Sequence, residues 1–233
     1  MLWVRDQTGR FPWRPYYHAV EIDRICERRV RTFLRARHGR VAYPVTTDDL
    51  TLLIEQEADD LDLFADLSGM AAPGVEVQGL TTLRPGRRAR VEIARELSER
   101  SARLARLRTT LAHELGHVLL HQDVIDRQAA GDAENGEAAE GGDGVTMPPC
   151  TNVSVGGASR ADWMEWQAGY ASGALLMPRM AVATVVLPIL RRHGRAPHRW
   201  EGNIGRLTDA VQGHFLVSDA AALVRLRQLG LVP

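Results

Sequence analysis

Residues 108–121 read Arg-Thr-Thr-Leu-Ala-His-Glu-Leu-Gly-His-Val-Leu-Leu-His and contain the pattern His113-Glu114-x-x-His117. Apolar residues recur every three or four positions through this stretch, which predicts a long helix with one buried face over about 98–121. Two histidines four residues apart lie on one face of a helix, where two neutral imidazoles can bind a single Zn²⁺. Glu114 lies one position round from His113 and can reach a metal-bound water as a general base without ligating the metal.

A zinc hydrolase needs a third protein ligand and an open fourth position. Asp123 stands ten residues after His113 and is a second candidate for the third ligand. The chain would have to turn before it, usually at a glycine, but Leu120 stands at that position. A continuing helix would carry Asp123 away from the metal. His121 lies about 12 Å from His113 along a helix axis, too far to share one ion comfortably, so we expect a helix-end group or a partner of a ligand. Glu165, on a separate predicted helix, is the better candidate, and its alternative interpretation is an exposed helical carboxylate.

The rest of the chain reads as short elements separated by Gly, Pro and polar turns. We expect helices at 17–37, 46–58, 98–121, 162–176, 180–192, 203–213 and 218–229, and strands at 61–67, 75–83 and 89–94. Between the third and fourth of these helices, residues 128–145 are rich in Gly, Ala and acids and lack large apolar groups. This composition predicts a flexible insertion at about 126–160.

The composition excludes several function classes. The chain has 233 residues, of which 45% are hydrophobic and 25% charged, and these fractions are ordinary for a globular protein. All 29 basic residues are arginine, so Schiff-base lysine chemistry and a P-loop lysine are impossible. Two cysteines cannot form a disulfide framework, the start has no apolar signal segment, and no stretch is long enough for a membrane span. We therefore expect a cytoplasmic protein with no membrane partner.

The formal net charge is zero, although arginine and acidic residues fall in alternating blocks. A nucleic-acid footprint would raise the overall pI, so we expect no direct nucleic-acid contact. The predicted helix pair at 203–213 and 218–229 carries Arg225 and Arg227, which we expect to face outward, and a DNA-reading helix-turn-helix is one interpretation of it. Nothing there resembles an array of base-contacting residues, so a structural or partner-binding role is the preferred prediction.

The chain resembles the ImmA/IrrE-type metallo-endopeptidase family, because several of the family's motifs occur in it in the same order. The resemblance rests on residues 108–121, on Asp162-Trp-Met-Glu-Trp-Gln-Ala168, and on Leu175-Leu-Met-Pro178. Residues 77–81 and 84–86 resemble the family's strand segment before the active-site helix, and residues 215–230 resemble its C-terminal helical region. One position departs from the family pattern, because Gly169 stands where the family usually has Asn.

The resemblance implies a zincin-like α+β core, with residues 1–178 as the metallopeptidase domain and 179–233 as a helical C-terminal subdomain. It implies Zn²⁺ held by His113, His117 and Glu165, and peptide-bond hydrolysis by zinc-bound water with Glu114 as catalytic base. The implied partner is a protein substrate, a helix-turn-helix transcriptional repressor. The alternative is a non-proteolytic, partner-binding regulator of the same fold with a weak or structural metal.

The sequence is compatible with more than one role for several residues. Cys150 is either a plain thiol or a fourth zinc ligand that holds the enzyme latent, because thiolate is a good zinc ligand. The residue that would stabilise an oxyanion is not identified; the candidates are Tyr170, His193, His198 and His214, each also explicable as structural. An edge of the strands at 75–83 or 89–94 is a candidate for pairing with an extended substrate.

Overall fold

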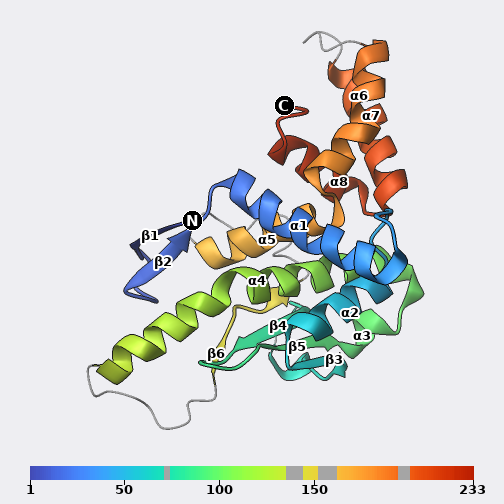
Figure 1. The fold of residues 1–233 in the computed structure, drawn as a ribbon. Helices are drawn as coiled ribbons and strands as arrows, with labels where there is room; N and C mark the ends of the chain where they lie inside the picture. The colour runs from blue at the N-terminus through green and yellow to red at the C-terminus, as the bar shows by residue number, and fades with distance from the viewer. Residues whose placement is uncertain (71–73, 135–143, 152–161, 194–199) are drawn as a thin grey trace.

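The computed structural model describes residues 1–70, 74–134, 144–151, 162–193 and 200–233, and within them the fold is α+β (Figure 1). Eight α-helices and seven short strands occur in the described ranges, in accord with the predicted fold class. The strands are β1 Leu2–Arg5, β2 Trp13–Tyr16, β3 Asp60–Ala65, β4 Val77–Leu83, β5 Arg90–Ala94, β6 Val145–Thr146 and β7 Cys150–Thr151. The helices are α1 Ala19–His38, α2 Thr47–Glu57, α3 Arg95–Ser98, α4 Leu104–Glu134, α5 Trp163–Leu176, α6 Arg179–His193, α7 Trp200–Phe215 and α8 Asp219–Gln228.

The main sheet is small and mixed, with β4 near its centre. Its order is β3-β5-β4-β6, and β7 also pairs with β4. Only β3 and β5 run parallel, and every pairing of β4 is antiparallel. Six of the seven residues of β4 are buried, because α4 covers one face of this strand. The strand next to the helix that carries His113 is therefore the most enclosed in the sheet.

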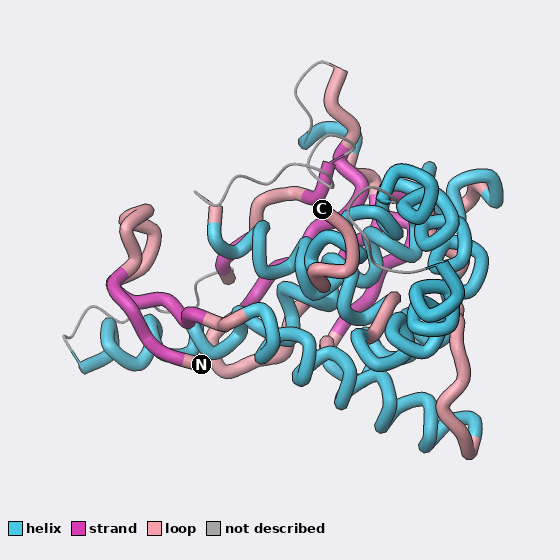
Figure 2. Tube along the Cα trace, turned by 90° about the horizontal axis from the view of Figure 1, so that it is seen from above, coloured by secondary structure: helices cyan, strands magenta, loops and turns pink. Residues whose placement is uncertain are grey.

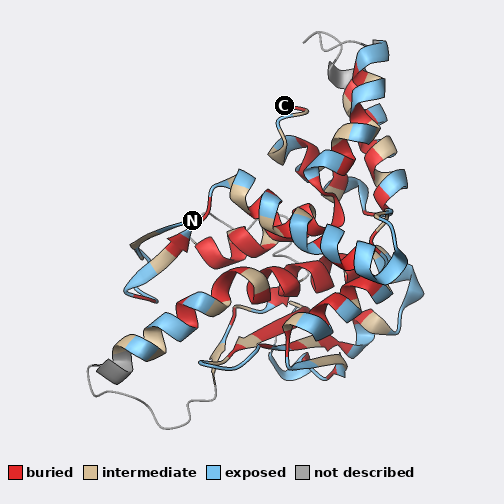
Figure 3. Cartoon of the chain, in the orientation of Figure 1, coloured by how far each residue is buried: buried red, intermediate tan, exposed pale blue. Residues whose placement is uncertain are grey.

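Helix α4 is the longest element and lies between the sheet and α5 (Figure 1). The sequence predicts its end near His121, but the helix continues to Glu134. This corrects the first part of the predicted flexible insertion, since Ala, Gln, Asp and Glu between 122 and 134 are compatible with a helix and no proline interrupts them. In the added turns Val124 and Ile125 are still buried, and from Asp126 to Gly131 the residues are exposed or partly exposed (Figure 3).

The second part of the predicted insertion is also corrected where the structure describes it. Residues 145–146 and 150–151 pair with β4 as strands, while 135–143 and 152–161 lie outside the described residues. The composition of this segment gives no sign of pairing, because its apolar residues are few and two prolines separate the strands. The pairing depends on a partner strand that is distant in sequence, which a local pattern does not report.

Helix α5 packs tightly against α4. Asp162 caps its start by accepting from the backbone N–H groups of Met164 and Glu165, and Pro178 follows its end, as predicted. A Cβ at Gly116 would lie 3.1 Å from the backbone of Ala168 and from the Cβ of Ala171. Glycine at 116 therefore permits the close approach of the two helices that carry the candidate ligands.

The two ends of the chain form the elements at the periphery of this core. The hairpin β1–β2, which the sequence did not lead us to expect, projects at one side (Figure 2). Helices α6 to α8 confirm the three predicted C-terminal helices and lie on the side of the molecule away from this hairpin (Figure 1). The outward orientation predicted for Arg225 is wrong: its side chain is fully buried, because it pairs with Asp23 of α1.

No single helix within the described ranges has both the length and the apolar composition needed to cross a membrane. Helices α5 and α6 meet that test only when joined, and the pair bends by 62° at the break between them.

Candidate metal centre

Helix α4 presents His113 and His117 on its buried face. The two side chains are almost fully buried, and their Nε2 atoms lie 3.1 Å apart. This placement follows from the helical period, since residues four apart stand one above the other on one face. The sequence pattern alone therefore fixes two of the nitrogen donors relative to each other.

Glu165 approaches the same point from α5. Its Oε1 lies 3.0 Å from Nε2 of His117 and its Oε2 lies 3.3 Å from Nε2 of His113. The alternative interpretation, an exposed helical carboxylate, is wrong, because the residue is buried. His113, His117 and Glu165, hereafter the donor triad, are placed to hold a metal ion.

The charges of the donor triad are set by mutual contact. Burial alone would raise the pKa of the Glu165 carboxyl, but its interactions with His113 and His117 outweigh burial and lower that pKa well below its usual range. Burial likewise opposes protonation of His113, yet the contact with Glu165 and the nearby Glu114 charge raise the pKa of this imidazole. The cluster thus carries concentrated negative charge that favours a bound cation, either a proton or a metal ion.

Glu114 lies beside the donor triad and is fully buried. The Thr81 hydroxyl, on β4, donates to its Oε2 over 2.6 Å, whereas its Oε1 has no hydrogen-bond partner. A Cβ on Gly79 would lie 2.6 Å from that free oxygen, so only glycine leaves room for the carboxylate here. Burial raises the pKa of the Glu114 carboxyl above its usual value, because desolvation disfavours the charged form.

A chain of hydrogen bonds behind His117 fixes which of its nitrogens carries a proton. Gln167 donates from Nε2 to the carbonyl of Pro15 over 3.1 Å, so its Oε1, 3.1 Å from Nε2 of His121, must accept. Burial lowers the pKa of His121 well below its usual value, so the ring is neutral and its Nδ1 is an acceptor. That atom lies 3.0 Å from Nδ1 of His117, which must therefore donate, leaving Nε2 of His117 with a free lone pair for a metal.

The other ligands and acid–base groups considered from sequence do not join the donor triad. Asp123 is exposed and belongs to no metal-competent group in the described residues. The Tyr170 hydroxyl donates to Asp23 in a separate buried network. His214 is exposed, and the side chain of His193 and all of His198 lie outside the residues described. The sequence reasoning missed Thr81, Gly79 and Gln167, whose roles depend on contacts between separate elements.

Cys150 is buried and lies beside His113 and Glu114. One potential ligand atom from each of these three residues falls within 4.8 Å of the others. His117 and Glu165 are not part of this second group. Burial raises the pKa of the Cys150 thiol. Cys150 is the first residue of β7, which lies in the segment predicted to be flexible.

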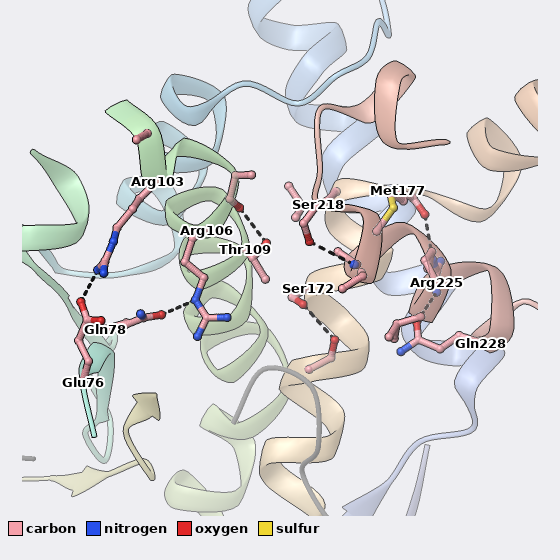
Figure 4. Close-up of a pocket in the computed structure, with 18 residues that line it drawn as sticks. Glu76, Gln78, Arg103, Arg106, Thr109, Ser172, Met177, Ser218, Arg225 and Gln228 are labelled. Atoms are coloured by element: carbon pink, nitrogen blue, oxygen red, sulfur yellow. Dashed lines mark hydrogen bonds and ion pairs between the residues drawn. The ribbon is translucent and has the colours of Figure 1, made fainter. Parts of the chain in front are cut away.

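A cavity of about 560 Å³ is lined by Thr109 of α4 and Gly169 of α5, each four residues along its helix from a member of the donor triad, but neither the donor triad nor Glu114 lines it. Its walls come from the start of β4, the first turns of α4, the middle of α5 and helix α8 (Figure 4). Arg106 and Gln78 contact each other on the wall, and Arg103 pairs with Glu76 beside them. Gly169, the position of the departure from the family pattern, also lines this cavity, and a Cβ there would meet no atom within 4 Å.

A scan of protein-family models found no match to this chain, and a search of curated proteins likewise found none.

Proposed function

We propose that this protein is a zinc-dependent endopeptidase of the ImmA/IrrE type, with a zincin-like core and a cytoplasmic protein substrate. The observation that carries the proposal is the placement of Glu114 beside the donor triad, with one carboxylate oxygen held by Thr81 and the other without a partner. Buried polar groups are normally satisfied, so an orphaned oxygen next to a metal-competent cluster points to chemistry.

The donor set suits zinc. Two imidazole nitrogens and one carboxylate form the combination found in several zinc hydrolases. Ligands about 2.0 Å from a tetrahedral ion are separated by about 3.3 Å, and the distances within the donor triad are 3.0, 3.1 and 3.3 Å. Three protein donors also leave a position for the reacting species, as a catalytic rather than structural site requires.

The chain's own residues supply the proton transfers. When bound, zinc acts as a Lewis acid that polarises a peptide carbonyl and acidifies water. Glu114 accepts a proton at Oε1, its unpartnered atom, and returns it to the leaving amine. Thr81 holds Oε2, so the carboxylate keeps one orientation through both transfers. The chain through His121 and Gln167 keeps the proton of His117 on Nδ1, away from the metal.

The proposed substrate is a helix-turn-helix transcriptional repressor, and this choice rests on the resemblance of the motifs alone. The alternative of a non-proteolytic, partner-binding regulator shares the fold and differs in whether zinc binds and hydrolysis follows. Zinc content is therefore the first quantity that separates the two functions.

The experiment is elemental analysis of zinc in the wild type and in Glu165→Ala, at about pH 7.5 where the ligand histidines lose their protons on binding metal. We expect about one zinc per chain in the wild type and markedly less in the variant. Asp123→Ala is the matched control, because it removes an exposed carboxylate from α4 and should leave the zinc content unchanged.

The outcomes separate the two functions. Zinc in the wild type but not in Glu165→Ala supports the proposed ligand set, and hydrolysis of a purified repressor then tests the substrate. A wild-type protein that takes up no zinc after reconstitution would exclude the peptidase and favour the partner-binding regulator. Equal zinc in Glu165→Ala would show that the third ligand is a different residue.

A further inference from the structure

Residues 145–151, hereafter the closing strand, cover the outer edge of β4 beside the donor triad. Thr146 pairs with Thr82, and Cys150 pairs with Gly79, both antiparallel. Between these ladders, the backbone N–H of Met147 donates to the carbonyl of Thr81 over 2.8 Å. An extended peptide can bind a free sheet edge in the same way, by adding one strand. The chain therefore fills its own edge next to the candidate catalytic residues.

The closing strand also brings a side chain into the site. Cys150 stands opposite Gly79, the residue whose missing Cβ makes room for the free oxygen of Glu114. The sulfur lies in one cluster with His113 and Glu114 and is fully buried. A thiol is only a weak hydrogen-bond donor, and Glu114 Oε1 remains without a partner beside it. Cys150 therefore fills the space beside Glu114 without providing a hydrogen bond to its Oε1.

The backbone pairing of the closing strand is short, although the side chains of Met147 and Cys150 are buried. Each of its two ladders contains two residues, and Pro148 and Pro149 between them have no N–H to donate. The pairing register also shifts between Val77 and Gly79. The principal side-chain anchor is Arg106, whose Nη2 donates to the carbonyl of Thr151 over 2.7 Å. Short, interrupted ladders open at lower cost than a continuous strand, although opening here also exposes the buried side chains of Met147 and Cys150.

We propose that the closing strand occupies the position on β4 at which an extended substrate peptide would pair. Cys150 fills the space beside Glu114 until such a peptide displaces the strand. This inference rests on the proposed peptidase function for the identity of the displacing peptide. The covering of the metal centre, by contrast, depends only on the contacts of Cys150, Gly79 and Arg106. Its test therefore uses readouts that need no substrate.

The experiment compares Arg106→Ala with Arg103→Ala, both in a Cys26→Ser background so that Cys150 is the sole thiol. Each arginine lies near the start of α4; Arg106 donates to the closing strand, whereas Arg103 pairs with Glu76. The zinc-loaded proteins are treated with iodoacetamide, and alkylation of Cys150 is followed by intact mass. In parallel, the rate of zinc transfer to a coloured chelator is measured.

We expect Arg106→Ala to speed both alkylation and zinc transfer by about tenfold or more, because it removes a charge-assisted hydrogen bond from the closing strand. Arg103→Ala should leave both rates near those of the parent protein. Removing a positive charge near the donor triad would by itself slow zinc loss, so faster transfer reports opening rather than electrostatics. Thermal melting confirms that each variant is folded.

Met147→Pro is the second variant, and it removes the N–H that donates to Thr81. If Arg106→Ala fails to fold, the same two rates are measured in Met147→Pro. Unchanged rates in a folded releasing variant would overturn the proposal and make residues 145–151 a fixed part of the sheet. If both rates rise but no variant hydrolyses casein or a repressor, the covering stands and the peptidase function fails.

Discussion

Two buried polar clusters each include one side chain of α5, Tyr170 in one and Glu165 in the other, and they differ in how completely their groups are satisfied. In the first, hereafter the ion-pair network, Arg225 donates to Asp23 over 2.5 Å and to the carbonyl of Met177 over 3.0 Å, and Tyr170 donates to Asp23 over 3.1 Å. In the second, the metal centre, Glu114 Oε1 has no partner and the donor triad converges on one point. The first cluster is complete in itself, and the second is not.

This difference separates structure from function. The ion-pair network joins α1 to α8, residues 202 apart in sequence, and every charge in it has a counterpart, so its effect is to hold the two ends of the chain together. The candidate metal centre keeps one buried carboxylate oxygen, Oε1 of Glu114, without a partner, at a cost in stability that proteins accept at functional sites.

The largest expected effect is on hydrolysis in Glu114→Gln. The amide keeps the size of the side chain but cannot accept and return a proton, so the rate should fall by about 10³-fold. Zinc content should stay at the wild-type value, because Glu114 is not in the donor triad. The melting temperature should not fall, since a buried charge is removed. Full activity in this variant would exclude Glu114 as the base.

The corresponding amide change in the ion-pair network is Asp23→Asn, and it should act on stability alone. It leaves the fully buried Arg225 without its counter-charge, which typically costs about 3–5 kcal/mol of unfolding free energy. Urea unfolding measures this loss, and zinc affinity at a temperature where the variant is folded should equal that of the wild type. A loss of zinc affinity would show that the two clusters are coupled through α5.

A smaller effect is expected when the support of one ligand is removed. His121→Phe keeps a ring of similar size but deletes the nitrogen that accepts from His117, and such losses typically weaken metal affinity about 10- to 100-fold. Competition with a chelator measures the affinity, and His214→Phe, at an exposed position, is the matched control. Unchanged affinity in His121→Phe would mean that α4 packing alone orients His117.

The smallest effect is the pH dependence of zinc affinity. The pKa of His113 is raised above its usual value, so a proton competes with zinc from a higher pH than for a free imidazole. Glu165, with its lowered pKa, remains a carboxylate over the same range. Affinity should be constant above the pKa of His113 and fall about tenfold per pH unit below it. Chelator competition between about pH 6 and pH 8 checks this; a flat profile would contradict the raised pKa.

Features encoded over a few residues were predictable from the sequence. The α+β class, the helix carrying His113 and His117, the cap at Asp162 and the stop at Pro178 all follow from periodicity and from residue-specific backbone preferences. The limits of α4 and the pairing of residues 145–151 were predicted incorrectly, because the low-complexity composition around 128–145 resembles a linker. Part of that segment is helix and part is strand once neighbouring elements supply contacts.

The sequence by itself determined the spacing of two histidines and one glutamate on α4, because a helix repeats with a fixed period and needs no distant partner to do so. Only the tertiary structure decided that Glu165 completes the donor triad, that His121 and Gln167 set the proton of His117, and that Cys150 stands beside Glu114. Each of these contacts joins separate elements, and the close packing at Gly116 and Gly79 that permits them is a property of the folded core rather than of any local pattern.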